Sequence, residues 1–151
     1  MWFSRKQAAK VPPEDAAGSA ARLPKQITTK TRGDAAEAAA LDHLRQRGLR
    51  LVETNYRTPG RGGGEVDLIM RTPDGTLVFV EVRQRSSASH GGAGASITSA
   101  KQRRIIFAAR HYLMRFASLP PCRFDVVLVN GDLAAGPGAT IEWIAGAFDA
   151  S

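Results

Sequence analysis

Acidic side chains interrupt two apolar stretches that are predicted to be neighbouring strands. Glu65 and Asp67 lie in the run of residues 65–70, and Glu81 and Arg83 lie in the run of residues 76–83. Side chains two residues apart on a strand share a face, so each run places its two polar side chains together. A carboxylate among apolar strand residues is costly to bury unless a cation or hydrogen-bond donors compensate it.

The segment Pro73-Asp74-Gly75 predicts a tight turn that brings Asp67 and Glu81 close to each other. Two carboxylates at that spacing suit a shared Mg²⁺ or Mn²⁺ ion, completed by waters and a substrate phosphate. Such an ion lowers the pKa of a bound water and stabilises charge on a scissile phosphate. The structural alternative is that Glu81 pairs with Arg83 or Arg85 while Asp67 hydrogen-bonds a turn. The residue pattern alone leaves both interpretations open.

The elements that must position these acids follow from the periodicity of the apolar residues. Helical spacing from Ala36 to Leu44 predicts a helix over residues 34–47, with Asp34 near its start and Gly48 after its end. Strands are predicted over residues 49–57, 65–70, 76–83, 124–129 and 140–144, with the third in the centre of the sheet, and a long helix over 97–117. Residues 86–95 have the composition of a mobile loop. The predicted order is α-β-β-β-α-β-β, an α/β fold with a mixed sheet flanked by helices.

Length and composition indicate one globular domain. The chain has 151 residues, of which 43% are hydrophobic and 23% are charged, which excludes wholesale disorder and a fibrous protein. It has no run of 18 apolar residues, so we expect no membrane-spanning helix. Basic residues follow directly after Trp2 and Phe3, leaving no apolar core for a secretory signal, and Cys122 is the single cysteine. We therefore expect a cytoplasmic protein.

The net charge of +7 is unevenly distributed along the chain. Residues 1–32 contain seven basic and two acidic residues and show no sustained apolar period. We therefore predict a flexible basic arm over 1–32 and a folded domain over 33–151. A basic arm suits a polyanionic partner, because each neutralised phosphate releases counterions. A solvated tail that aids solubility is the alternative.

A series of motifs closely resembles the YraN family, a group of small bacterial proteins described as endonuclease-like. The series is Gly33…Glu37…Ala40…Leu44…Gly48, Asn55-Tyr56-Arg57, Gly64-Glu65-Val66-Asp67-Leu68-Ile69, Val78-Phe79-Val80-Glu81-Val82-Arg83, Lys101 and Arg123-Phe124-Asp125-Val126. The resemblance covers residues 33–144. That family is similar to the PD-(D/E)XK nuclease superfamily and to archaeal Holliday-junction resolvases, which implies a restriction-endonuclease-like core.

The resemblance also implies roles for individual residues. Asp67 and Glu81 match the two acids of the superfamily motif, and Glu37 matches an additional acid that helps to hold the metal. Arg83 stands where the superfamily carries a lysine that orients or polarises the attacking water. Arginine remains protonated and cannot act as a base, although it can orient a water or stabilise negative charge. Lys101 is the nearest substitute cation, and the alternative is an ordinary exposed helix lysine or a phosphate anchor.

Two functions from different classes follow from these residues. The first is a divalent-metal-dependent DNA endonuclease for branched or structured DNA, with Asp67, Glu81, Arg83 and Lys101 as catalytic residues. The second is a nucleic-acid-binding module on the same fold, with catalysis lost or impaired because Arg83 replaces lysine. In either case we expect phosphate contacts from Arg83, Arg85, Lys101 and Arg104, which position a backbone without reading its sequence. Analogy with junction-binding proteins allows a homodimer.

Overall fold

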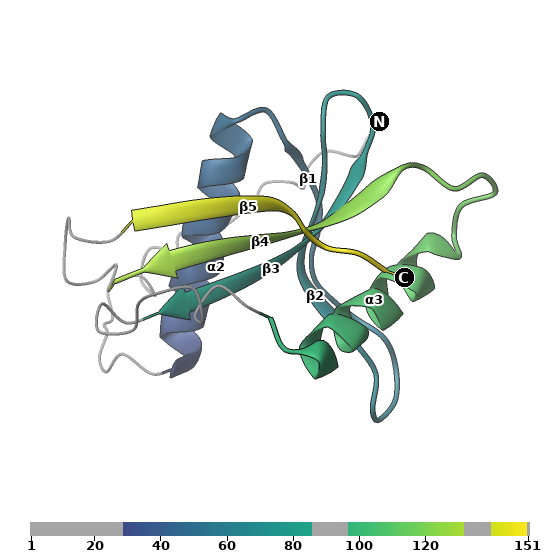
Figure 1. The fold of residues 1–151 in the computed structure, drawn as a ribbon, viewed down its shortest axis with the longest axis horizontal. Helices are drawn as coiled ribbons and strands as arrows, with labels where there is room; N and C mark the ends of the chain where they lie inside the picture. Colours follow the sequence, from purple (N-terminus) through teal and green to yellow (C-terminus); the bar gives the residue numbers. More distant parts are fainter. Residues whose placement is uncertain (1–28, 86–96, 132–139, 151) are drawn as a thin grey trace, which may run out of the picture.

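A mixed β-sheet carries one helix on each of its faces (Figure 1). The computed structural model describes residues 29–85, 97–131 and 140–150. In chain order the elements are α2 (Thr29–Gln46), β1 (Arg50–Arg57), β2 (Glu65–Arg71), β3 (Leu77–Arg85), α3 (Ser99–Leu113), β4 (Cys122–Asn130) and β5 (Thr140–Phe148). The predicted α/β class and the predicted order of elements are confirmed.

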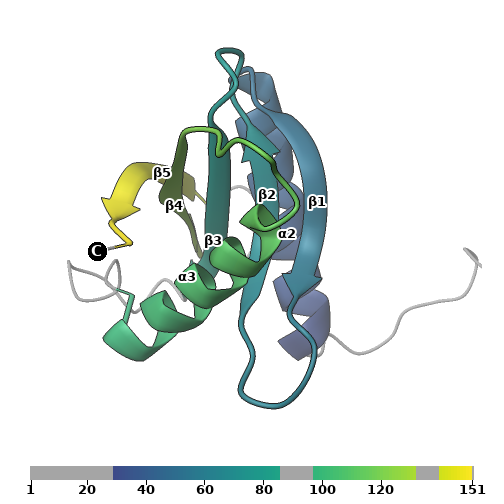
Figure 2. The same cartoon turned by 90° about the vertical axis from the view of Figure 1, so that its right-hand side faces the viewer.

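The five strands lie in the order β1-β2-β3-β4-β5, and only the pair β3–β4 is parallel. A parallel pair needs a crossover connection, and α3 lies within it, packed on the opposite face of the sheet from α2 (Figure 2). Strand β3 is central, as predicted, and its first five residues, Leu77 to Glu81, are buried.

Each face of the sheet has its own hydrophobic core. On the α3 face, Ile105, Ala109 and Tyr112 of the helix pack against Phe79 and Phe124 of the sheet. On the α2 face the cluster consists of Ala40, Leu44, Leu49, Leu68, Met70, Val78, Val80 and Val127. The alternation of β3 residues between these two clusters fixes which polar side chains of that strand face α3. Leu77 and Phe79 belong to the core on the α3 face, and side chains two residues apart on a strand share a face. Glu81 and Arg83 therefore also lie on the α3 face.

The first helix begins earlier than the predicted residue 34. It spans Thr29–Gln46, so Asp34 is inside the helix and is neither its N-cap nor part of its first turn. Gly33 suggested a boundary, but a glycine within a helix costs only about 1 kcal/mol relative to alanine. The helix ends at Gln46, one residue before the predicted end, and Gly48 follows it with a φ of 98°, as the Leu49 N–H donates to the Leu44 carbonyl at 3.1 Å.

The long helix is shorter than predicted at both ends. Thr98 is its N-cap, and the Thr98 hydroxyl accepts a hydrogen bond from the Lys101 N–H at 3.1 Å, which fixes the start at Ser99. At the other end, the Met114, Arg115 and Phe116 N–H groups each donate to the carbonyl three residues earlier. The chain therefore continues as tight turns rather than as α-helix, well before the two prolines.

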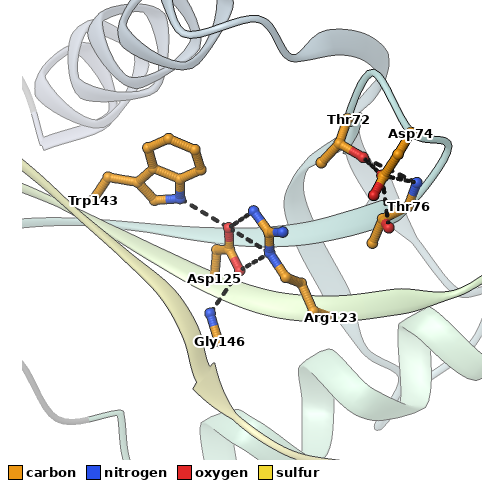
Figure 3. A network of polar contacts seen from close by, with 7 residues as sticks. All are labelled: Thr72, Asp74, Thr76, Arg123, Asp125, Trp143 and Gly146. Atoms are coloured by element: carbon orange, nitrogen blue, oxygen red, sulfur yellow. Dashed lines mark hydrogen bonds and ion pairs between the residues drawn. The ribbon is translucent and has the colours of Figure 1, made fainter.

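The last strand is longer than the predicted 140–144 because Asp125 anchors its second half. The buried Asp125 carboxylate accepts from Trp143 Nε1 at 2.8 Å and from the Gly146 N–H at 3.0 Å, and it pairs with Arg123 (Figure 3). Gly146 has a φ of 64°, and the pairing of β4 with β5 shifts register between Phe124 and Val126. A kinked strand is therefore tied to β4 by a side chain where the ladder is irregular.

The predicted turn at residues 73–75 is present between β2 and β3. Asp74 accepts hydrogen bonds from the hydroxyls of Thr72 and Thr76 and from the Thr76 N–H (Figure 3). Gly75 has a φ of 94°, which glycine adopts without strain. This turn sets the register of the two strands that carry Asp67 and Glu81.

Two predicted segments fall outside the described residues. These are the loop at 86–95 and residues 1–28 of the basic arm, whereas Thr29–Arg32 of the predicted arm belong to α2. Within residues 29–85, 97–131 and 140–150, none of the helices has the length and apolar character needed to cross a membrane.

Candidate functional site

Asp67 lies where the backbone pairing between β2 and β3 ends. The last paired residues are Leu68 and Val80, so a continued ladder would next pair Asp67 with Glu81 and then Val66 with Val82. Instead, the Val82 N–H donates to Asp67 Oδ2 at 2.8 Å. The carboxylate thus takes the place of a backbone acceptor, and the two strands separate around it. Burial raises the pKa of Asp67, and the hydrogen bond from Val82 opposes this effect.

Glu81 lies beside Asp67 with its side chain 8% exposed. Burial and, second, the charge of Asp67 raise the pKa of Glu81 to about 8, while Lys101 lowers it less. Its Oε1 is buried without a hydrogen-bond partner, the single such side-chain atom in the described part of the chain. A buried, unsatisfied carboxyl oxygen destabilises the fold unless a cation or donor is supplied.

Glu37 approaches Asp67 from helix α2, on the other side of the sheet. Burial raises the pKa of Glu37, the charge of Asp67 raises it further, and a hydrogen bond from the Asn55 side chain opposes both. Asn55 lies opposite Asp67, because the pairs Thr54–Leu68 and Tyr56–Val66 flank it. It has a φ of 50°, the left-handed conformation that asparagine tolerates better than most residues. In this conformation Asn55 presents its side-chain amide to Glu37.

The three predicted metal ligands are Glu37, Asp67 and Glu81. Asp67 lies between the other two and interacts with both of them. Over the residues that the structure describes, no three His, Cys, Asp or Glu side chains are arranged as a ready set of metal ligands. The donors are nevertheless of the type that Mg²⁺ and Mn²⁺ prefer, and Glu81 Oε1, which has no hydrogen-bond partner, is available as an oxygen ligand. The three residues therefore have the chemistry, though not the arrangement, of ligands for such an ion.

Lys101 reaches these acids from the first turn of α3. Its Nζ lies 3.5 Å from Glu65 Oε2 and 3.7 Å from Glu81 Oε2, and its side chain is 22% exposed. It is therefore not the ordinary solvated lysine of a helix surface. The cap at Thr98 fixes the turn that carries Lys101, so the position of this cation depends on where the helix begins.

The two arginines of β3 have different surroundings. Arg83 is half-buried, and its charge lowers the pKa of Glu81, so the guanidinium lies near the acids. Arg85 donates through Nε to Asn130 Oδ1 at 2.7 Å at the end of β4. The sequence grouped both residues as phosphate contacts; Arg83 acts on the electrostatics of Glu81, whereas Arg85 binds Asn130 of β4.

Glu65 is a centre of charge that the residue pattern did not assign to the site. Its carboxylate lies 3.6 Å from Arg57, 3.5 Å from Lys101 and 3.9 Å from Arg104. The side chains of Arg57 and Arg104 are 72% and 52% exposed. The alternation of side chains along β2 predicts that Glu65 lies beside Asp67. Its three cationic partners come from β1 and α3, so their meeting with Glu65 depends on how α3 packs against these strands.

The arrangement combines buried carboxylates with a positively charged rim. The acids offer oxygen ligands to a cation, whereas Lys101, Arg83, Arg57 and Arg104 offer donors to anionic groups. A phosphodiester presents anionic oxygens and, when bound by a divalent ion, binds next to carboxylates. The region where β2 and β3 separate therefore has the charges needed to bind a phosphodiester beside the acids.

Comparison with known proteins gives the family. The family model described as "Uncharacterised protein family UPF0102" matches residues 36–129, which contain the three acids, Lys101 and Arg83. The chain is 76% identical over 153 residues to a UPF0102 protein of Polaromonas naphthalenivorans (strain CJ2), and the match covers 100% of both chains. It is 66% identical over 123 residues to a UPF0102 protein of Albidiferax ferrireducens, covering 82% of this chain and 91% of the relative. The chain therefore belongs to the UPF0102 family, which is the YraN family that its motifs resemble.

Proposed function

We propose that this chain binds nucleic acid, with DNA as its partner, and cleaves branched or structured DNA as a divalent-metal-dependent endonuclease. Glu37, Asp67 and Glu81 are the proposed ligands of a Mg²⁺ or Mn²⁺ ion. Lys101 and Arg83 are proposed to stabilise the negative charge that develops on the scissile phosphate. Arg104 and Arg85 are proposed as backbone contacts farther along the strand.

One observation carries the proposal: Glu81 Oε1 is buried, unpartnered and beside a second carboxylate. A purely structural acid at this depth is expected to satisfy both of its oxygens, as Asp125 does with three donor residues. An oxygen left open toward an acidic neighbour and a lysine is typical of a site that receives a ligand.

When bound, the proposed ion would supply a water of lowered pKa and a positive charge beside the phosphate. The chain's own residues perform the remaining tasks. The Val82 N–H holds Asp67 in a fixed orientation, and Asn55 does the same for Glu37. Lys101 donates from the α3 side, where its ammonium already lies within 4 Å of two carboxylates.

A nucleic-acid-binding module with impaired catalysis is the second candidate. The observation that favours it is that Lys101 is already paired with both Glu65 and Glu81, so the acids have a counter-ion within the chain. Arg83 adds a second fixed positive charge and cannot act as a base. In this case the acids would serve to position cations for phosphate binding.

Incubation of the full chain with branched and linear DNA in Mg²⁺, Mn²⁺ or EDTA separates the two candidates. An endonuclease cuts only with the metals, and Glu81→Gln, which keeps the size of the side chain, abolishes cutting. The thermal midpoint is a second readout: Mn²⁺ should raise it for the wild type but not for Glu81→Gln. If the wild type binds DNA yet neither cuts it nor responds to Mn²⁺, the endonuclease is excluded and the binding module stands.

Substitutions of the two cations assign their roles. If Arg83 replaces the lysine of the superfamily motif, Arg83→Lys keeps or raises cleavage and Arg83→Ala removes it. If Lys101 has taken over, Lys101→Ala abolishes cleavage, while Arg83→Ala mainly weakens DNA binding. If both alanine variants cut at the wild-type rate, neither cation has a catalytic role.

A further inference from the structure

A glycine-rich loop lies next to the acids, between β1 and β2. It runs from Thr58 to Gly64 and contains four glycines. The Thr58 N–H donates to the Gly64 carbonyl at 3.0 Å, and the Gly64 N–H donates to Thr58 Oγ1 at 2.8 Å. The buried Thr58 thus closes the loop at its base and gives it a defined shape.

Two of the glycines are required by close packing. A Cβ on Gly63 would lie 2.1 Å from Thr58 Oγ1, and a Cβ on Gly64 would lie 2.0 Å from the Arg104 carbonyl oxygen. The loop is therefore in direct contact with the backbone of α3. Gly60 and Gly62 have positive φ values of 87° and 67°, with open space around them. This half of the loop is shaped by backbone conformation rather than by packing.

The loop and the helix border an open cavity of about 310 Å³ at the surface. It is lined by Arg57, Thr58, Gly60, Gly62, Gly63, Gly64, Glu65 and Arg104. Among the residues that the structure describes, the N–H groups of 60–63 donate to no other group of the chain. The cavity is therefore lined by glycines whose backbone donors are unused within the chain and by two guanidinium groups, and both are donor types that bind phosphate oxygens.

The charge of the cavity wall also suits an anion. Glu65 is its one acid, and that carboxylate is shared by Arg57, Arg104 and Lys101 at 3.5–3.9 Å. Of the residues that line the cavity, two carry a positive charge and one a negative charge, so the wall has a net positive charge. Both guanidinium groups therefore lie at the cavity wall, within 4 Å of Glu65.

We propose that this cavity, named here the loop cradle, binds a backbone phosphate of the nucleic acid next to the phosphate at the acids. That the phosphate belongs to a nucleic acid rests on the proposed function. Glu65 and Asp67 are two residues apart on β2, which is about 7 Å along a strand. Consecutive phosphates of one strand are separated by about the same distance, because they step around the helix as well as along its axis. The cradle would thus set the position of the strand relative to Asp67 and Glu81 without reading its sequence.

Inorganic phosphate tests the cradle directly. In ¹H–¹⁵N spectra of the full chain, phosphate should shift the amide signals of Gly60, Gly62 and Gly63 saturably, whereas chloride at equal ionic strength should not. The double variant Arg57→Gln/Arg104→Gln should lose these shifts. Shifts that do not saturate, or that chloride reproduces, would overturn the proposal.

DNA binding in EDTA tests the ligand without requiring cleavage. For a labelled duplex, the Arg57→Gln/Arg104→Gln variant should bind at least about tenfold more weakly, with a salt slope reduced by about 1 to 2. The control is Arg50→Gln, the same change at the opposite end of β1, which should change binding less than about twofold. If the double variant binds as tightly as this control, the cradle is excluded while the proposed function stands. If phosphate shifts the glycine amides but the wild type binds no DNA, the phosphate site stands and the proposed function fails.

Discussion

At the scale of single residues, Glu81 links the stability of the fold to pH. Its pKa in the folded chain is about 8, against 4.5 for an unperturbed glutamate. Because the folded state holds this proton more tightly than the unfolded state, the stability that it contributes is complete below pH 4.5. It is lost as the pH rises toward 8. Burial of the charged form is thus the dominant cost at this position.

We therefore predict that Glu81→Gln flattens the dependence of stability on pH. Glutamine resembles the protonated acid and does not titrate. The variant therefore lacks the contribution of Glu81 to the slope of the unfolding free energy against pH, which is at most about 1.4 kcal/mol per pH unit. Denaturant unfolding at several values between pH 5 and pH 8 measures the difference. Wild type and variant should be similar near pH 5, with the variant the more stable near pH 8. Parallel curves would show that Glu81 titrates normally.

At the scale of elements, Asp125 connects β4 to β5 across an irregular ladder. Its carboxylate is fully buried and accepts from Arg123, Trp143 and Gly146. Removing one member of such a network leaves the other groups without partners in a dry environment. The second half of β5 therefore depends on this one side chain more than on backbone pairing.

We expect Asp125→Ala to destabilise the chain by about 3 kcal/mol or more, measured by denaturant unfolding. The matched control is Asp74→Ala, which also removes an acid with several hydrogen bonds, but from an exposed turn. The control should have a much smaller effect, because water replaces the missing partners. Equal destabilisation by the two substitutions would exclude the anchoring role of Asp125.

At the scale of the whole molecule, local pattern predicted the parts of the site that depend on neighbouring strands. The turn at 73–75 fixes the register of β2 and β3, so the meeting of Asp67 and Glu81 followed from the sequence. The assignment of Glu37 to the site came from the family resemblance, because helical periodicity does not predict which strand residue the Glu37 carboxylate contacts.

The cationic side of the site depends on tertiary packing and could not be predicted in the same way. Arg57 and Arg104 are 47 residues apart and meet only because Gly64 allows α3 to approach the loop. The positive φ of Asn55, within a strand, is likewise not predicted by its residue pattern. The predicted starts of both helices were also wrong. Helix α2 continues through Gly33 and begins at Thr29, and α3 begins at Ser99 because Thr98 caps it.

The basic segment before α2 should act through charge alone. Residues 1–28 contain five basic and two acidic residues. Their deletion is predicted to weaken DNA binding and to reduce its salt slope, by about 0.9 for each phosphate that the segment neutralises. The thermal midpoint should stay within about 2 °C, because the two cores lie within the described residues. A large drop in that midpoint would instead assign these residues a structural role.

The hydrogen bond from Val82 to Asp67 makes one amide proton a reporter of the site. In a regular ladder a backbone carbonyl would protect that proton, but here a side chain does so. Hydrogen exchange at Val82 should therefore accelerate in Asp67→Ala and stay slow in Asp67→Asn, whose amide oxygen still accepts. Phe79 and Val80, in the paired part of β3, should be unaffected. The exchange rate of one backbone proton thus records whether the central acid is held in place, in a chain that has neither substrate nor metal bound.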